Sequence, residues 1–134
     1  MSDKRINKTE ALKLVRSFIE KELINEKWYL NIKPHVKAMV LYGSVAKELN
    51  RPDSDIDFLI FVPLEIEEKY TSGEYFFTFE NYEINIVLRS IELLRKLATE
   101  RNDFEAEVFK GSEIIWERDS EVRDLIKRIK GGQN

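Results

Sequence analysis

The sequence predicts one α/β (α+β) domain in which helices flank a small mixed β-sheet. The chain has 134 residues, of which 43% are apolar, and this is typical of a single packed domain with its own core. Apolar residues recur at helical spacing near both ends, and short apolar runs typical of strands lie between them. There is no internal repeat, low-complexity tract or linker between domains. We therefore predict a single domain over residues 1–134.

The N-terminal third is expected to form a helix followed by a linker. Apolar side chains at helical spacing predict a helix over about residues 9–25, with Thr9 as its N-cap. Residues 25–37 have a mixed composition, and Pro34 disfavours a helix there, so we interpret them as a linker.

Two apolar strands are expected next, with a short helix and a polar loop between them. The first runs over residues 36–42 and the second over residues 56–62. The second is apolar at nearly every position, which is the pattern of a strand covered on both faces.

The second half predicts a β-hairpin and then helices around an edge strand. The hairpin covers about residues 74–88, with its turn at Glu80-Asn81. Three of its aromatic residues share one face, which is a candidate dimer or partner surface if no helix covers it: Tyr75, Phe77 and Phe79. Residues 90–130 then predict C-terminal helices, the first capped by Ser90, and an edge strand near residues 113–116.

Composition excludes several function classes. The formal net charge of −3 gives no positive field to attract extended nucleic acid, so we do not expect it as a partner. The absence of Cys excludes disulfides and thiolate metal sites, and fits a reducing compartment. No run approaches the roughly 18 apolar residues of a membrane span, and the N-terminus has no apolar leader region. We therefore expect a cytoplasmic protein without a membrane partner.

The stretch 39–62, MVLYGSVAKELNRPDSDIDFLIFV, combines the features of a phosphate site and a metal site. Gly43-Ser44 ends one strand, where backbone N–H groups can approach an anion without a Cβ in the way. Asp55 and Asp57 open the next strand on one face, because side chains alternate with period two. Unpaired carboxylates beside a buried strand are costly, and Mg²⁺ or Mn²⁺ would compensate them. The pattern indicates a metal–nucleotide site.

Other polar residues of this stretch have two interpretations each. Lys47 lies one helical turn after Ser44, where it would contact phosphate or remain an exposed helix residue. Ser54 would orient Asp55 or serve as a turn hydroxyl. Gly43-Ser44 taken alone would be a plain turn with a helix cap.

The motif resembles that of the DNA polymerase β nucleotidyltransferase superfamily. It is most similar to the minimal nucleotidyltransferase (MNT) domains, which include the antitoxin partners of HEPN-type toxins. Their pattern is an apolar strand, Gly-Ser, a spacer and then acidic-apolar-acidic, met here by Gly43-Ser44 and Asp55-Ile56-Asp57. The resemblance covers residues 39–62 and extends to residue 88 or beyond. It implies a nucleotidyltransferase-like fold.

The resemblance also implies a role for each matching residue. Gly43 and Ser44 would hold the phosphates of a bound NTP, with ATP as the expected substrate. Asp55 and Asp57 would be the catalytic metal ligands for Mg²⁺ (or Mn²⁺). An acceptor hydroxyl would attack the α-phosphorus and release pyrophosphate.

The sequence departs from the family at the third acidic residue. By register, Asn85 occupies the position of the family's third carboxylate, and Glu83 lies two residues earlier on the same face. Three alternatives stay open: Glu83 replaces the missing acid, Asn85 suffices at a lower rate, or the protein binds nucleotide without turnover.

Two functions are therefore expected from the sequence. The first is an enzyme that transfers NMP to a hydroxyl on a protein or a small molecule, with AMP from ATP as the expected case. The alternative is a weak or inactive nucleotide-binding antitoxin module that acts by contact with a HEPN-type partner. The sequence leaves the oligomeric state open, with a homodimer as one prediction.

Overall fold

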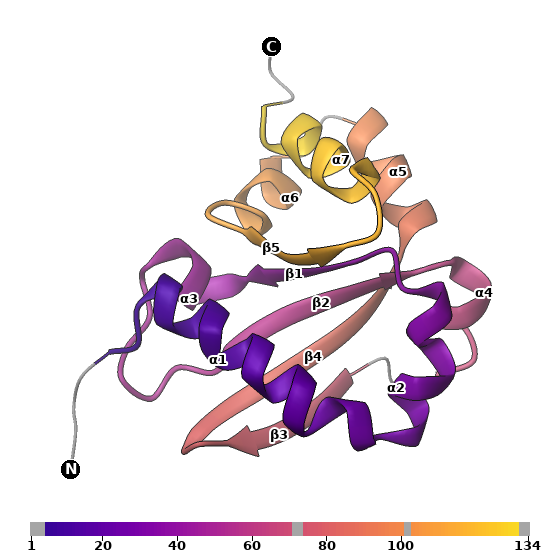
Figure 1. Cartoon of the computed structure of the whole chain (residues 1–134). Helices are drawn as coiled ribbons and strands as arrows, with labels where there is room; N and C mark the ends of the chain where they lie inside the picture. Colours follow the sequence, from indigo (N-terminus) through magenta and orange to yellow (C-terminus); the bar gives the residue numbers. More distant parts are fainter. Residues whose placement is uncertain (1–4, 71–73, 101–102, 132–134) are drawn as a thin grey trace.

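A five-stranded mixed β-sheet forms the centre of the computed structural model, which describes residues 5–70, 74–100 and 103–131 (Figure 1). The strand order is β3-β4-β2-β1-β5. β2 and β4 are parallel, and the other three neighbouring pairs are antiparallel. The strands are β1 (Ala38–Tyr42), β2 (Ile56–Val62), β3 (Glu74–Phe79), β4 (Tyr82–Ser90) and β5 (Glu113–Glu117).

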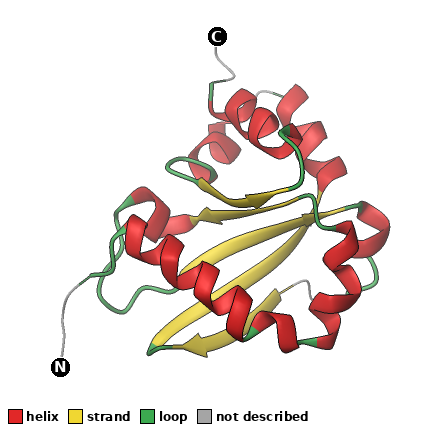
Figure 2. Cartoon of the chain, in the orientation of Figure 1, coloured by secondary structure: helices red, strands yellow, loops and turns green. Residues whose placement is uncertain are grey.

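Helices cover both faces of this sheet (Figure 2). One face is covered by α1 (Lys8–Lys21), the 3₁₀ turn η1 (Leu23–Asn25) and α2 (Lys27–Ile32), after which η2 (Lys33–His35) leads into β1. The other face carries α5 (Ile91–Thr99), α6 (Asp103–Val108) and α7 (Glu121–Lys130). Two short helices follow strand ends, α3 (Gly43–Lys47) after β1 and α4 (Leu64–Glu67) after β2.

The sheet separates two hydrophobic cores, and β2 contributes to both. Phe58 and Ile60 pack toward α1, whereas Leu59 and Phe61 pack toward α5 and α7. Because side chains alternate along a strand, a strand buried on both faces needs apolar residues at nearly every position. This explains the continuous apolar run of residues 56–62. The predicted α/β class with a helix-flanked mixed sheet is confirmed.

The first helix differs from its prediction at both ends. Its N-cap is Asn7 and not Thr9, because the Asn7 side chain accepts a hydrogen bond from the Glu10 backbone N–H at 2.8 Å. The Glu10 carboxylate in turn accepts from the Asn7 N–H at 3.0 Å, which completes a capping box. The helix ends at Lys21, Glu22 is a turn residue, and η1 covers the last three residues of the range expected to be helical.

The segment expected as a linker, residues 25–37, contains α2 and η2. α2 has only six residues, too few for a clear helical period, yet it buries Tyr29 and Ile32 in the first core. Tertiary packing, rather than local propensity, stabilises a helix this short. Pro34 lies within η2, where its missing N–H does no harm.

The hairpin forms as predicted, with its turn at Glu80-Asn81. Both turn residues have positive φ, 49° and 71°, as a type I′ two-residue turn requires. Its aromatic face is covered by this chain's own helices. Phe77 packs on Phe18 of α1 with ring centroids 5.1 Å apart, and Tyr75 stacks on Trp28 of α2 at 3.7 Å. That face is therefore not a partner surface.

Ser90 caps α5 as expected, accepting a hydrogen bond from the Leu93 N–H at 3.0 Å. β5 forms one edge of the sheet, also as expected. Within the described ranges, none of the helices has the length and apolar character needed to cross a bilayer.

Candidate functional site

Four polar or aromatic residues form a row across the sheet, on the face that also carries α5, α6 and α7. Tyr42 of β1 pairs with Asp57 of β2, Asp57 pairs with Asn85 of β4, and Asn85 pairs with Phe76 of β3. Directly paired residues point to the same face, so their side chains lie side by side. Strand pairing thus joins positions up to 43 residues apart in the sequence, Tyr42 and Asn85.

The two aspartates converge on the amide of Asn85. Its Nδ2 donates to Asp55 Oδ2 at 2.9 Å and to Asp57 Oδ1 at 3.2 Å. Asp55 is exposed at the start of β2, and Asp57 is half-buried two residues further on. The three side chains therefore form a compact group of oxygens and one amide at the start of β2.

The backbone at Gly43 lies close to the Asp57 side chain. β1 ends at Tyr42, α3 begins at once, and Gly43 has a φ of 84°. A Cβ built at this position would lie 2.7 Å from Asp57 Oδ2, closer than real Cβ contacts allow. Only glycine fits here, both for its left-handed conformation and for the space beside the carboxylate.

Burial disfavours the ionised form of the Asp57 carboxyl when no counter-charge is present. Burial raises the pKa of the Asp57 carboxyl from 3.8 to about 6, the hydrogen bond from Asn85 opposes this rise, and the negative charge of Asp55 adds to it. Burial also raises the pKa of Tyr42, and the charge of Asp57 raises it further. Tyr42 is therefore a protonated phenol and not a base at neutral pH.

The donor set suits a hard divalent cation in part. Carboxylate oxygens are the ligands that Mg²⁺ and Mn²⁺ prefer, and an Asn amide oxygen is an acceptable neutral ligand. Among residues 5–70, 74–100 and 103–131, no three His, Cys, Asp or Glu side chains are placed to hold a metal ion together. A cation here would bind two carboxylates, with Asn85 turned to present its oxygen.

Glu83 lies on the same strand but has a different partner. Its exposed carboxylate accepts a hydrogen bond from Thr78 Oγ1 at 2.9 Å, across the hairpin. Asn85, and not Glu83, is the side chain that contacts both aspartates in this arrangement.

The remaining polar residues of the motif lie around the group without touching it. Ser44 is half-buried beside Gly43, and its hydroxyl has no hydrogen-bond partner among the described residues. Ser54 Oγ accepts from the Arg51 N–H at 2.8 Å, so it is a turn hydroxyl here. Lys47 forms an ion pair with Glu107 of α6 at 3.3 Å.

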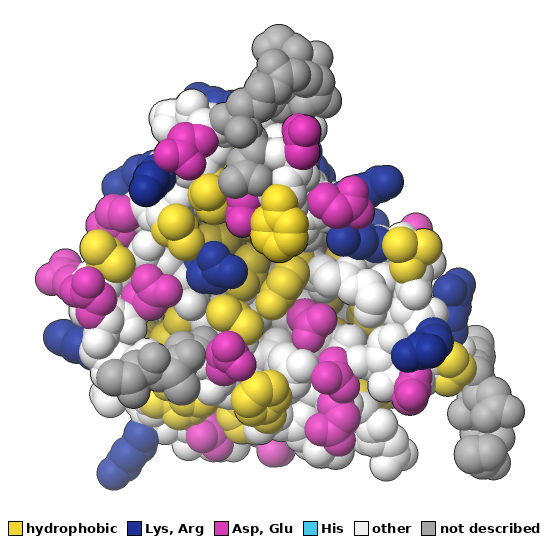
Figure 3. All heavy atoms as spheres, turned by 180° about the vertical axis from the view of Figure 1, so that it is seen from behind, with side chains coloured by type: hydrophobic (Ala, Val, Ile, Leu, Met, Phe, Trp, Pro, Cys, Tyr) yellow, Lys and Arg dark blue, Asp and Glu magenta, His cyan; other side chains and the backbone are white. Residues whose placement is uncertain are grey.

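Two further residues on this face were not expected as site residues. Phe76 is 66% exposed, although it lies next to Asn85 in the row. Arg89 is four residues beyond Asn85 on the same side of β4, and its positive charge acts on both Tyr42 and Glu67. The period-two spacing of Arg89 from Asn85 was visible in the sequence, but the proximity of Phe76 and Arg89 to Asp57 depends on strand pairing. On this side of the molecule, hydrophobic side chains gather around one basic side chain, and acidic side chains lie further out (Figure 3).

Comparison with family models gives one match over most of the chain. The model described as "Polymerase beta, Nucleotidyltransferase" matches residues 24–121. This range includes β1, β2, β4 and the four residues of the row. No curated protein matches the sequence.

Solved structures of similar fold include a nucleotidyltransferase-like protein from Exiguobacterium sibiricum. The TM-score is 0.54 at 12% identity, over 89% of this chain and 38% of that one. The chain thus spans well under half the length of that protein, and the likeness concerns the fold. Weaker matches are a toxin-antitoxin structure with AMP-PNP (TM-score 0.43, 17% identity, 85% and 86% of the two chains) and the Cid1 poly(U) polymerase (TM-score 0.36, 15% identity, 78% and 40%).

Proposed function

Because the chain belongs to the polymerase beta nucleotidyltransferase family, we propose that it is a Mg²⁺-dependent nucleotidyltransferase. It transfers NMP to a hydroxyl on a protein or a small molecule, and the expected reaction is the transfer of AMP from ATP. One observation supports this most strongly. Asp55 and Asp57 meet at Asn85 beside a glycine that has no room for a Cβ.

Each residue of this group has a defined task in the proposal. Gly43 lets the start of α3 approach the triphosphate without a Cβ in the way, and the unpartnered hydroxyl of Ser44 is available to a phosphate oxygen. The carboxylates of Asp55 and Asp57 hold Mg²⁺ or Mn²⁺, which when bound polarises phosphate oxygens and stabilises the charge of the leaving pyrophosphate. Lys47 contributes to phosphate binding only if its ion pair with Glu107 opens.

Asn85 is the point on which turnover depends. A third carboxylate would add negative charge for a second cation and could accept a proton, whereas an amide does neither. Asn85 reduces the repulsion between the Asp55 and Asp57 carboxylates by donating a hydrogen bond to each of them. We therefore expect nucleotide binding to be retained and the rate of transfer to be low, unless Glu83 leaves Thr78 and supplies the missing acid.

The same observation favours a second candidate function. A chain that binds nucleotide with two carboxylates and lacks the third acid fits an antitoxin module that acts by contact with a HEPN-type partner. In that case the nucleotide stabilises the module, and no group transfer takes place.

Transfer and binding assays separate the two functions. The protein is incubated with Mg²⁺ and α-labelled ATP, with and without candidate acceptors, while pyrophosphate release is followed. The enzyme hypothesis predicts label on an acceptor and equimolar pyrophosphate. Calorimetric binding of Mg-ATP without any turnover would support the contact-acting module instead. Loss of activity in Glu83→Ala, with activity retained in Asn85→Ala, would identify Glu83 as the third acid.

A further inference from the structure

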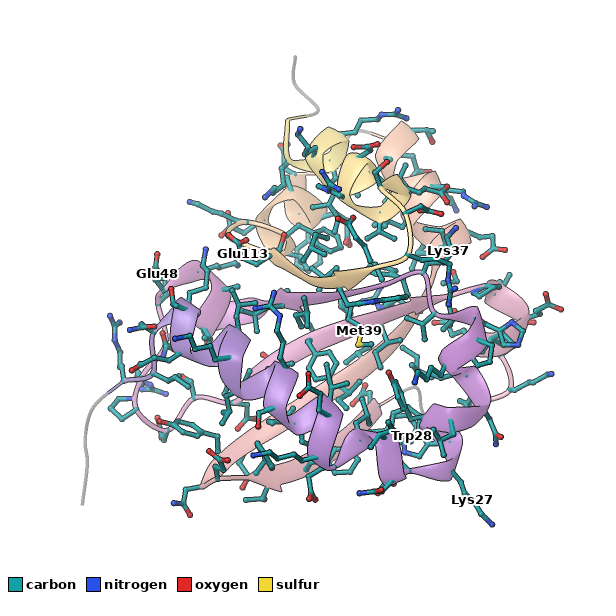
Figure 4. The ribbon with its side chains drawn as sticks, in the orientation of Figure 1. Lys27, Trp28, Lys37, Met39, Glu48 and Glu113 are labelled. Atoms are coloured by element: carbon teal, nitrogen blue, oxygen red, sulfur yellow. The ribbon has the colours of Figure 1, made fainter. Side chains whose placement is uncertain are left out.

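A cavity of about 630 Å³ opens on the face of the sheet opposite Asp57, between α1, α2 and β5. Its volume lies within the range of small-molecule sites, roughly 300–1,000 Å³. Met39 of β1 lines it, and Figure 4 shows this residue in the space framed by the three elements. The cavity is separated from the aspartates by the thickness of the sheet, so it is not part of the site described above.

Apolar and aromatic side chains form the interior of the cavity. Tyr29 of α2 and Trp116 of β5 line it together with Met39, and both Tyr29 and Met39 are buried. Trp116 is 43% exposed, and the Arg118 guanidinium carbon lies 5.5 Å from the centre of its ring. A large aromatic side chain left partly exposed on a cavity wall is available for contact with a ligand.

The charged residues at the cavity are predominantly cationic. Arg16, Lys33 and Arg118 line it, against a single acid, Glu20. Arg118 donates to the Val36 carbonyl at 2.9 Å and so is held in place by the backbone. This local excess of positive charge stands out in a chain whose net charge is −3.

None of these three cations has a carboxylate partner. Within the part of the chain that the structure describes, Arg16, Lys33 and Arg118 form no ion pair, and Arg16 has only a long hydrogen bond of 3.4 Å to the Ile115 carbonyl. Other basic residues, such as Lys37 and Arg95, are paired with acids at 2.7–3.4 Å. Cations beside an apolar interior favour a ligand whose anionic group remains near them.

We propose that this cavity binds a small molecule with an apolar body and an anionic head group. The apolar body lies against Tyr29, Met39 and Trp116, where it removes apolar surface from water. The anionic head group lies near Arg16 and Lys33. This site is independent of the proposed nucleotidyltransferase activity, and its occupant is neither the nucleotide nor the acceptor.

Dodecanoate is a suitable probe, with dodecan-1-ol as its neutral counterpart of equal chain length. Calorimetric titration below the micellar concentration should show one saturable site for dodecanoate and at least tenfold weaker binding of the alcohol. The double variant Arg16→Gln, Lys33→Gln should weaken dodecanoate binding by a similar factor. The matched double variant Lys127→Gln, Arg128→Gln, which removes two exposed cations of α7 outside the cavity, should leave it unchanged.

Fluorescence locates the probe independently of affinity. Bromododecanoate should quench the tryptophan emission of the native protein, and most of this quenching should disappear in Trp116→Phe, which retains Trp28. Equal affinity for acid and alcohol, no loss in the Arg16/Lys33 variant, unchanged quenching without Trp116, or the absence of saturable binding would each overturn the proposal.

Discussion

At the scale of single residues, Asn85 has the largest influence on the candidate site. It occupies the position across from Asp57 on the parallel strand, and its amide is shared by both aspartates. An amide that bridges two carboxylates lowers their mutual repulsion without neutralising their charge. We therefore expect the group to retain enough negative charge to bind one cation.

Restoring the third carboxylate should increase metal affinity and transfer. In Asn85→Asp, a third carboxylate replaces the amide that donates hydrogen bonds to Asp55 and Asp57. We therefore expect tighter Mg²⁺ binding and transfer at least tenfold faster, and we expect the metal-free protein to be less stable. Label transfer from α-labelled ATP and urea unfolding with and without Mg²⁺ measure these effects. Asn81→Asp, at the exposed hairpin turn, is the matched control. A variant at Asn85 that gains neither affinity nor rate would contradict the assignment of this position.

Asp57 should make the stability of the metal-free protein depend on pH. Its pKa rises from 3.8 to about 6 on folding, chiefly because of burial. Between about pH 4 and about pH 6, the folded chain therefore holds a proton that the unfolded chain has already lost. This proton binding stabilises the folded chain, and the stabilisation is lost as the pH rises through about 6. We expect Asp57→Asn to be the more stable protein at about pH 7.5, with a smaller difference at about pH 4.5. Urea unfolding at both pH values checks this, and a difference that grows on acidification would contradict it.

Gly43→Ala should damage both the fold and the site. The new Cβ would meet Asp57 Oδ2 at 2.7 Å, and the φ of 84° would be strained for any L side chain. We expect a loss of roughly 1–3 kcal/mol in the free energy of unfolding and weaker Mg-ATP binding in the remaining folded protein. Ser44→Ala is the comparison, because it removes the proposed phosphate contact without straining the backbone. Native stability in Gly43→Ala would contradict the close approach of Gly43 to Asp57.

At the scale of elements, the sequence predicts strands better than short helices. β2 was predicted at its exact bounds because burial on both faces leaves an unmistakable apolar run. α2 was missed because six residues cannot show a helical period and because its stability comes from Tyr29 and Ile32 in the core. The prediction of the α1 N-cap was wrong because both Asn7 and Thr9 are good N-cap residues. Only the position of Glu10, three residues after Asn7, distinguishes them.

The hairpin turn contains a strain that substitution should relieve. Glu80 has a φ of 49°, a conformation that costs an ordinary L residue roughly 1–2 kcal/mol. Glycine adopts it freely, so Glu80→Gly should raise the free energy of unfolding by about 0.5–1 kcal/mol after its greater chain entropy is counted. Urea unfolding measures the change, with Glu83→Gly, in the extended part of the hairpin, as a control expected to lose stability. A destabilised Glu80→Gly variant would contradict the turn geometry.

At the scale of the whole molecule, the sheet separates two surfaces of different chemistry. One carries the row from Tyr42 to Phe76 with the two aspartates, and the other carries the apolar cavity with Arg16 and Lys33. The aspartates and Gly43 could be found from the sequence because they lie in one continuous motif. Phe76 and the cavity could not, because they depend on the pairing of β3 with β4 and on helices packing beside β5.

Binding of Mg-ATP by calorimetry tests the central claim most directly. The native protein and the double variant Asp55→Asn, Asp57→Asn are titrated with ATP in the presence and absence of Mg²⁺, after urea unfolding has confirmed that both are folded. The account predicts Mg²⁺-dependent ATP binding to the native protein and at least a hundredfold weaker binding to the variant. Equal affinity of the two proteins for Mg-ATP would contradict the assignment of Asp55 and Asp57 as the metal ligands of a nucleotide site.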